Sequence, residues 1–198
     1  MATQVLSPHE RELILGGQRS GKSRRAEQRA VDWLAASPGM HRAVLIATAQ
    51  AYDDEMQERI VRHQADRAER VPGMRTIEEP VELARAVVTQ SAPDTLVVID
   101  CLTLWLTNLL MPLRSEVARP VTRTPSAHAT MLLIALREAR GPVVLVGNEI
   151  GLGVIPLGRE TRAFVDALGR LNQDVAAACG RVTLMAAGLP LSLKAPAG

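Results

Sequence analysis

Aromatic residues are scarce in this sequence. They make up 2% of its 198 residues, and they are Trp33, Trp105, Tyr52 and Phe164. The hydrophobic fraction of 47% therefore consists mainly of aliphatic side chains, a composition that suits a parallel sheet covered by helices. Proteins that bind single-stranded nucleic acid usually stack bases on aromatic rings in a basic groove, so the shortage of rings argues against that class.

An excess of charge of either sign is also lacking. The chain has 23 basic and 21 acidic side chains, which gives a formal net charge of +2. No large field attracts a polyanion, so nucleic acid is not an expected partner. The length suits one domain spanning residues 1–198. Residues 1–11 show no hydrophobic periodicity, and we expect them to form a loose tail.

Cysteines and long apolar runs are equally rare. Cys101 and Cys179 each lie inside an apolar stretch, which predicts buried free thiols rather than a disulfide framework or a metal site. Free thiols suit a reducing compartment. The longest apolar runs, such as 95–99, are far shorter than a membrane-spanning helix, and the N-terminus lacks an apolar signal core. The sequence therefore predicts a cytoplasmic protein with no membrane span.

Short apolar runs alternate with helical stretches along the chain. Strands are expected at 13–15, 43–47, 95–99, 142–146 and 182–185. Helices are expected at 22–36, 53–66, 80–90, 102–111, 127–140 and 159–178. This alternation predicts an α/β domain with right-handed crossovers, in which ligands bind at the carboxyl ends of the strands. The Pro- and Arg-rich residues 112–126 are expected to form a surface loop, which either only connects two helices or covers a substrate or meets another subunit.

An octapeptide between the first expected strand and helix has the spacing of a phosphate-binding loop. It consists of Gly16, Gly17, Gln18, Arg19, Ser20, Gly21, Lys22 and Ser23. Glycines let backbone N–H groups turn toward phosphate oxygens, and the helix N-terminus adds positive potential. We expect Lys22 to reach the β- and γ-phosphates and Ser23 to bind Mg²⁺. The alternative is a glycine-rich turn that only caps a helix.

Two carboxylates follow buried strands. Asp100 ends the apolar run 96–99, where it can contact Mg²⁺ or one of its waters, although an acidic residue there can also be a helix N-cap. Glu149 follows the run 143–147 and is a candidate to orient the metal or to accept a proton from a substrate hydroxyl. The alternative for Glu149 is a loop carboxylate in water.

A histidine lies on the helix expected after the second strand. Glu55, Arg59 and His63 are spaced so that they share one face of that helix. Taken alone, His63 is most simply a surface or structural residue.

Several separated motifs resemble the family of bifunctional adenosylcobinamide kinases and adenosylcobinamide-phosphate guanylyltransferases. Besides the octapeptide they are ATAQ at 47–50, DDEM at 53–56, RI at 59–60 with His63 and Arg67, RTIE at 75–78, DC at 100–101, TNL at 107–109, NEIG at 148–151 and GRLNQ at 169–173. The resemblance extends over residues 13–194. The helix with His63 and the two later Asn-containing motifs are its most particular parts.

The resemblance implies a P-loop NTPase fold with a RecA-like, mostly parallel sheet and helices on both faces, assembled as a homo-oligomer, a trimer. It also implies two reactions. ATP or GTP phosphorylates the aminopropanol hydroxyl of the corrinoid adenosylcobinamide, and GMP is then transferred from GTP to adenosylcobinamide phosphate. The second transfer passes through a guanylyl-histidine at His63 and yields adenosylcobinamide-GDP and pyrophosphate.

The residue patterns and the resemblance together predict three groups of site residues. The catalytic residues are His63, Lys22 and Glu149, and the metal ligands are Ser23 and Asp100. Besides the octapeptide, the nucleotide-binding residues are Ala49, Gln50, Ala51, Tyr52, Gln64, Ala65, Asp66, Arg67, Glu78 and Asp100. Two alternatives remain: a P-loop small-molecule kinase without guanylyltransferase activity, and a nucleotide-dependent switch whose output is a conformational change in a partner.

Overall fold

The structure is a computed structural model that describes residues 6–7, 9–51, 53–112 and 123–195. Its strands are β1 (Arg11–Gly16), β2 (Arg42–Ala47), β3 (Arg75–Glu78), β4 (Thr95–Asp100), β5 (Val143–Asn148), β6 (Arg181–Ala186) and β7 (Leu189–Lys194). Its helices are α1 (Lys22–Ala36), α2 (Asp54–Arg70), α3 (Leu83–Gln90), α4 (Leu102–Leu110), α5 (Pro125–Glu138) and α6 (Arg159–Ala178).

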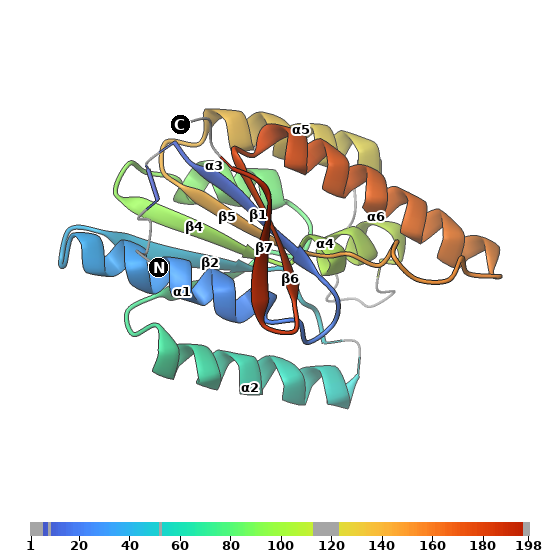
Figure 1. The fold of residues 1–198 in the computed structure, drawn as a ribbon, viewed down its shortest axis with the longest axis horizontal. Coiled ribbons are helices and arrows are strands. Elements are labelled where there is room, and N and C mark those ends of the chain that lie inside the picture. The colour runs from blue at the N-terminus through green and yellow to red at the C-terminus, as the bar shows by residue number, and fades with distance from the viewer. Residues whose placement is uncertain (1–5, 8, 52, 113–122, 196–198) are drawn as a thin grey trace.

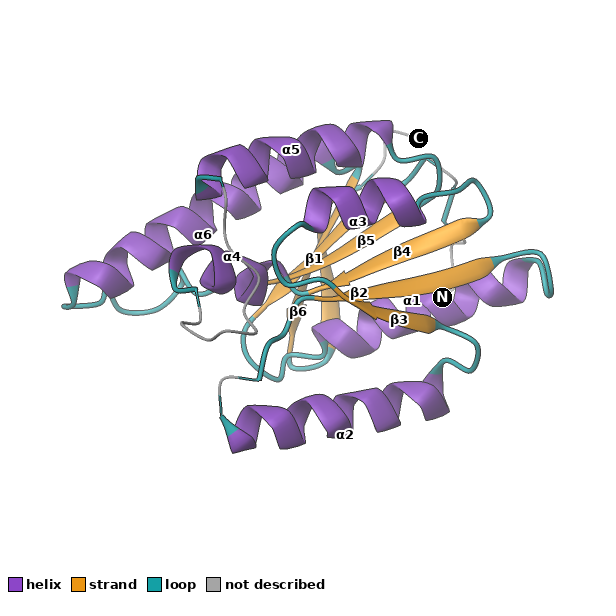
Figure 2. Cartoon of the chain, turned by 180° about the vertical axis from the view of Figure 1, so that it is seen from behind, coloured by secondary structure: helices purple, strands orange, loops and turns teal. Residues whose placement is uncertain are grey.

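The strands form one seven-stranded sheet in the order β3-β2-β4-β5-β1-β6-β7. All neighbouring strands are parallel except β6 and β7, which are antiparallel. Helices α3 to α6 cover one face of the sheet and α1 covers the other (Figure 1). Figure 2 shows α2 lying outside the sheet, alongside α1.

The core consists of two hydrophobic layers, one on each face of the sheet. Alternate residues of β1 enter different layers: Leu13 packs with the side chains of α3 to α6, and Ile14 packs with those of α1. Trp105 of α4 and Trp33 of α1 are the large aromatic members of these layers, and both are buried. Because both faces are covered, the central strands are continuous apolar runs without polar alternation.

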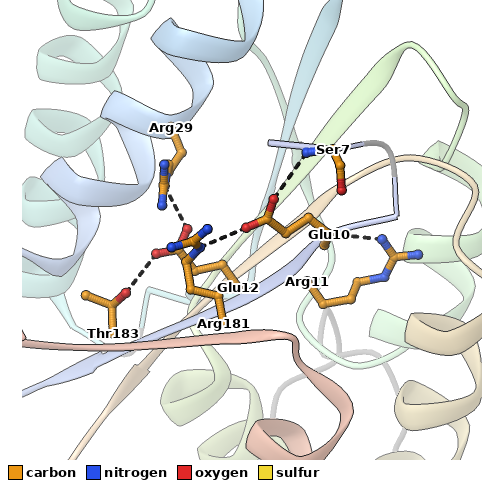
Figure 3. Close-up of polar contacts among 7 residues, drawn as sticks. All are labelled: Ser7, Glu10, Arg11, Glu12, Arg29, Arg181 and Thr183. Carbon is orange, nitrogen blue, oxygen red and sulfur yellow. Dashed lines mark hydrogen bonds and ion pairs between the residues drawn. The ribbon is translucent and has the colours of Figure 1, made fainter. Parts of the chain in front are cut away.

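A polar cluster joins β1, α1 and β6 near the amino end of β1 (Figure 3). The Glu12 carboxylate, which is fully buried, accepts hydrogen bonds from Arg29 Nε at 2.7 Å and from Thr183 Oγ1 at 2.9 Å. Arg181 pairs with Glu10 at 2.8 Å in the same cluster. A buried carboxylate is tolerated only when it is paired in this way, so the cluster fixes α1 against the strand that leads into the phosphate-binding loop.

The structure corrects several boundaries expected from the sequence. Strand β1 begins at Arg11, and Leu6 is buried in the core, whereas Ser7 and His9 are exposed. Strands β3 and β7 were not expected, and α2 continues four residues beyond 66. Residues 125–126 belong to α5, because Pro125 occupies its first turn and the Thr124 side chain caps it. The rest of the expected 112–126 loop lies outside the described residues, apart from 112 and 123–124.

The structure also describes the state of the two cysteines and the apolar character of the helices. Cys101 and Cys179 are both buried and free, as predicted. Among the helices that the structure describes, none combines the length and the apolar character needed to cross a membrane.

Candidate active site

Parallel strands bring the candidate residues to one edge of the sheet. Gly16 at the end of β1 lies beside Asn148 at the end of β5. Ala47 at the end of β2 lies between Asp100 of β4 and Glu78 of β3. Residues separated by up to about 130 positions in the chain therefore follow one another along the carboxyl edge of the sheet.

The phosphate-binding loop has backbone conformations that require glycine. Gly16 has φ 153° and Gly21 has φ 100°. A Cβ atom on Gly16 would lie 2.5 Å from the carbonyl oxygen of Met185 and 2.5 Å from Ser20 Oγ. Both positions therefore exclude a side chain, which is the physical basis of the two fixed glycines in the motif.

Polar side chains are enclosed by this loop. Lys22 is 8% exposed, and its Nζ donates a hydrogen bond to the carbonyl oxygen of Gly17 at 2.5 Å. Ser20 Oγ is buried and has no hydrogen-bond partner among the described residues. Ser23 lies half-buried in the first turn of α1. An amine and two hydroxyls are thus available where the loop faces the helix N-terminus.

The turn between β6 and β7 supports the loop from outside. Gly188 N donates to the carbonyl oxygen of Ser20 at 3.0 Å, and a Cβ atom on Gly21 would lie 3.3 Å from Gly188 Cα. Sequence reasoning missed this contact because β7 itself was not expected. The last strand of the sheet therefore helps to hold the phosphate-binding loop in shape.

Hydrogen bonds fix the ends of β2 and β4 to each other. Thr48 Oγ1 donates to the carbonyl oxygen of Cys101 at 2.7 Å and accepts from Cys101 N at 2.9 Å. Asn108 Nδ2 donates to the carbonyl oxygens of Thr48 and Pro80 at 2.8 and 3.0 Å. These groups are buried, so the backbone next to Asp100 is held without water.

The alternative role of Asp100 as a helix cap is wrong. The N-cap of α4 is Cys101, whose Sγ accepts from Leu104 N at 3.5 Å. Burial, together with the neighbouring Asp100 charge, raises the pKa of the Cys101 thiol to about 11. The half-buried Asp100 carboxylate is therefore not needed to cap the helix that follows it.

Glu149 lies next to the phosphate-binding loop. Its backbone N–H donates to the carbonyl oxygen of Gly16 at 3.1 Å. Its carboxylate is half-buried, and Oε1 accepts from Gly151 N at 2.8 Å. A carboxylate held by one backbone N–H keeps further lone pairs for another donor.

Two helices hold the peptide groups just before Glu149. Asn148 N donates to Thr103 Oγ1 of α4 at 2.8 Å, and Asn172 Nδ2 of α6 donates to the carbonyl oxygen of Asn148 at 3.1 Å. Asn172 Oδ1 is buried and has no partner among the described residues. The GRLNQ motif contains Asn172, but the sequence did not reveal that it clamps the end of β5.

Helix α2 carries His63 outside the sheet. His63 is exposed, and α2 is joined to its surroundings by polar contacts: Arg70 pairs with Glu27 of α1 at 2.9 Å, and Gln64 Nε2 donates to Glu78 of β3 at 3.4 Å. No hydrogen bond or ion pair between described residues joins His63 to the phosphate-binding loop. The structure thus places Glu149 beside the loop, Asp100 further along the same edge of the sheet, and His63 on a separate element.

The remaining nucleotide-binding candidates fall into two groups. Residues 49–51 follow β2 at the site edge, and Tyr52 lies outside the described residues. On α2, Asp66 pairs with Arg70 at 2.9 Å, the buried Arg67 contacts Thr76 Oγ1 of β3 at 3.5 Å, and Ala65 is exposed. Both groups border β3, the strand that was not expected.

Comparison with known proteins identifies the family. Over residues 12–193 the chain matches the family described as "Cobinamide kinase / cobinamide phosphate guanyltransferase". The chain belongs to this family. Its members combine kinase and guanylyltransferase activities, so the kinase-only enzyme and the nucleotide-dependent switch are both set aside.

Full-length relatives support the assignment. Bifunctional adenosylcobalamin biosynthesis protein CobP of Pseudomonas aeruginosa is 46% identical, with 93% of this chain and 97% of the relative covered. The proteins named CobU of Escherichia coli and Salmonella typhimurium are 34% and 36% identical, with 92% of this chain and 98% of each relative covered. The resemblance found in the sequence motifs is confirmed, and the chain is a bifunctional enzyme of cobalamin biosynthesis.

The fold also resembles that of a more distant protein. The crystal structure of flagellar accessory protein FlaH from Methanocaldococcus jannaschii aligns with a TM-score of 0.53 at 11% identity, covering 96% of this chain and 80% of that chain. At this identity the likeness concerns the fold alone. The predicted P-loop, RecA-like α/β fold is confirmed.

Proposed function

We propose that the two reactions of this enzyme use two elements, the carboxyl edge of the sheet for phosphoryl transfer and helix α2 for guanylyl transfer. The observation that carries this proposal is the strand register, which places Gly16, Asp100 and Glu149 on one edge. The kinase step does not use His63, which lies on α2.

In the kinase step, the loop N–H groups and Lys22 bind the β- and γ-phosphates of ATP or GTP. The aminopropanol hydroxyl oxygen of adenosylcobinamide attacks the γ-phosphorus, the bond to the β–γ bridging oxygen breaks, and Glu149 accepts the hydroxyl proton. The free lone pairs of Glu149 and its position beside Gly16 support this role. The unpartnered Ser20 hydroxyl supplies one more donor for a phosphate oxygen.

Ser23 and Asp100 suit Mg²⁺. Their oxygens are hard donors, both side chains are half-buried at the site edge, and Mg²⁺ bound to a nucleotide takes few ligands from the protein. When bound, Mg²⁺ neutralises charge on the phosphate oxygens.

In the guanylyltransferase step, His63 attacks the α-phosphorus of GTP and pyrophosphate leaves. A phosphate oxygen of adenosylcobinamide phosphate then attacks that phosphorus, the P–N bond breaks, and His63 is regenerated as adenosylcobinamide-GDP forms. The solvent exposure of His63 supports access by both phosphates. In this scheme the nucleotide contacts come from residues 49–52 after β2, from 64–67 on α2 and from Glu78 at the end of β3.

We also propose a homo-trimer acting in the cytoplasm, as the family resemblance implies. Exposed apolar side chains on neighbouring helices support a subunit contact, among them Val88 on α3 and Met131 and Ile134 on α5. Light scattering during size-exclusion chromatography measures the oligomer mass directly.

The decisive experiment is the intact-protein mass after incubation with GTP and Mg²⁺. We expect the wild type to gain one GMP that is released by acid, and His63→Ala to gain none. The same His63→Ala variant retains phosphorylation of cobinamide by ATP, because the kinase step does not use the imidazole.

His41 offers a matched control. It is stacked on Trp33 with ring centroids 3.8 Å apart and lies at the amino end of β2, away from the site edge. His41→Ala should gain GMP as the wild type does. Unmodified wild-type protein, or equal loss of both activities in His63→Ala, would contradict the assignment of His63.

A further inference from the structure

The loop between β5 and α6 is the most exposed apolar segment at the site edge. Four of its side chains are almost fully exposed: Leu152 at 81%, Val154 at 96%, Ile155 at 77% and Leu157 at 97%. Figure 1 shows this loop leaving the end of β5 and running beside α6 to the far end of that helix. So large an exposed apolar segment indicates a binding surface.

A hollow of about 570 Å³ lies between this loop and α6, within the usual range for small-molecule sites, roughly 300–1,000 Å³. Val154 and Ile155 line the loop side, and Asp166, Arg170 and Gln173 line the helix side. The hollow therefore has one apolar wall and one wall with both hydrogen-bond donors and acceptors.

Arg162 holds the loop against the helix. Its Nη1 donates to the carbonyl oxygen of Pro156 at 3.0 Å and also to that of Leu157. The loop is thus tied to α6 at its far end, while its near end is tied to the site through Glu149.

The inner end of the hollow adjoins the catalytic edge. Gly151, which lines the hollow, donates its N–H to the Glu149 carboxylate. Gln173 follows Asn172, the residue that binds the carbonyl oxygen of Asn148. The hollow is therefore connected to the phosphate-binding loop through one chain of hydrogen bonds, from Gly151 N to the Glu149 carboxylate and from Glu149 N to the carbonyl oxygen of Gly16.

We propose that this hollow binds the corrin macrocycle of the cobinamide substrate and directs its aminopropanol arm toward Glu149. This inference rests on the proposed function. The methyl-bearing ring edge of a corrin matches the apolar wall of Val154 and Ile155, and its carboxamide side chains match Asp166, Arg170 and Gln173. In the proposed function the nucleotide phosphates are bound by the loop 16–23, none of whose residues line the hollow.

The test measures cobinamide binding separately from nucleotide chemistry. Equilibrium dialysis of the full-length protein with cobinamide, followed by the visible absorbance of the corrin, gives the Kd for wild type, Ile155→Asp and Gln173→Ala. A buried apolar contact or a pair of hydrogen bonds corresponds to about 1.4 kcal/mol, so we expect the Kd to rise about tenfold in each variant. The acid-labile GMP gain with GTP alone needs no corrinoid and should be unchanged.

Met40→Asp is the matched control. Met40 is 72% exposed in the turn before β2, at the amino edge of the sheet, so the same change of an apolar side chain to a carboxylate there should leave the Kd for cobinamide unaltered. Circular dichroism establishes that each variant is folded.

Each other outcome has a distinct meaning. If the wild type does not bind cobinamide, the proposed function itself fails. If the wild type binds and both variants bind equally well, the hollow is not the corrin site. If a variant lost both the GMP gain and cobinamide binding, the loop would bind the nucleotide. If a variant had a lower oligomer mass, the loop would form a contact between copies of the chain. Either result would overturn the inference.

Discussion

The sheet edge and helix α2 are built in opposite ways. At the edge, hydrogen bonds from Thr48, Asn108 and Asn172 fix the backbone just after Asp100 and just before Glu149. Helix α2 has Arg67 as its only buried side chain among those described, and salt bridges and weak hydrogen bonds join it to its neighbours. Phosphoryl transfer depends on fixed geometry, whereas a nucleophile that must meet two successive substrates benefits from a loosely held element.

Replacing Lys22 should have the largest effect, because both reactions need the phosphates of one nucleotide to be held. We expect Lys22→Ala to lower both the kinase rate and the rate of GMP gain by about 10²–10³-fold or more. Lys194, the other lysine of the chain, hydrogen-bonds to the carbonyl oxygen of Ala176, and Lys194→Ala serves as the control in both assays. Loss of only one activity would mean that the two reactions use separate phosphate sites.

Loosening the end of β5 should lower the kinase rate selectively. Thr103→Val and Asn172→Ala each remove one partner of the Asn148 peptide, and we expect either to lower kcat of the kinase step about tenfold through misplacement of Glu149. The KM for ATP and the GMP gain should change little. If both activities fell equally and the melting temperature also fell, Thr103 and Asn172 would have only a structural role.

Loosening α2 should slow the gain of GMP and leave the kinase step unchanged. Arg70→Ala breaks the exposed pair with Asp66 and also removes the partner of the buried Glu27 carboxylate. A loss of about 1 kcal/mol in the attachment of α2 corresponds to about a fivefold slower GMP gain. Cobinamide phosphorylation should be unaffected. Arg62→Ala, on the same helix and also exposed, is the control; a kinase defect in Arg70→Ala would show that α2 shapes the sheet edge as well.

The two buried thiols make the free energy of unfolding depend on pH. Burial raises the pKa of Cys101 to about 11 and that of Cys179 to about 12, from 9.0 in the unfolded chain. Below pH 9 both states keep the proton. Above pH 9 the thiols of the unfolded chain lose their protons before those of the folded protein. The free energy of unfolding should therefore fall by about 1 kcal/mol per thiol at pH 10. Urea unfolding at pH 8 and pH 10 measures this fall.

A double Cys101→Ala, Cys179→Ala variant should lose most of that pH dependence. Iodoacetamide at pH 8 should label neither native thiol, but it should label a Gln57→Cys variant on α2 rapidly. Fast labelling of Cys101 would show that the sheet edge opens as readily as α2 and would remove the contrast between the two regions.

Sequence reasoning succeeded where one physical signal was strong. The buried runs of β2, β4 and β5 are continuous and apolar. Strand β4 ends at the candidate Asp100, and β5 and β2 end one and two residues before the candidates Glu149 and Ala49. Strand β3, with the sequence RTIE, has too few apolar residues to give that signal, and β7 carries Pro190 and is exposed throughout. The end of α2 was placed too early because an exposed helix has almost no apolar periodicity.

The candidate site shows the same difference between features with a strong local signal and features without one. Strand ends and glycine spacing were sufficient to predict that the octapeptide, Asp100 and Glu149 lie along one edge of the sheet, while their roles stay predictions. The clamp of Thr103 and Asn172 on Asn148, and the hollow beside α6, depend on tertiary contacts between segments up to about 45 residues apart, which no local pattern encodes.

The strand order also affects how the enzyme is synthesised. Among the described residues, β1 pairs with β5 and β6, both of which come from the last third of the chain, whereas β2 pairs with β3 and β4 from the first half. As the nascent chain emerges from the ribosome, the first half can form a three-stranded sheet while the octapeptide, although translated almost first, still lacks neighbouring strands. Nucleotide binding should therefore begin only when translation is nearly complete, and a chain stalled before β5 should be unable to bind GTP.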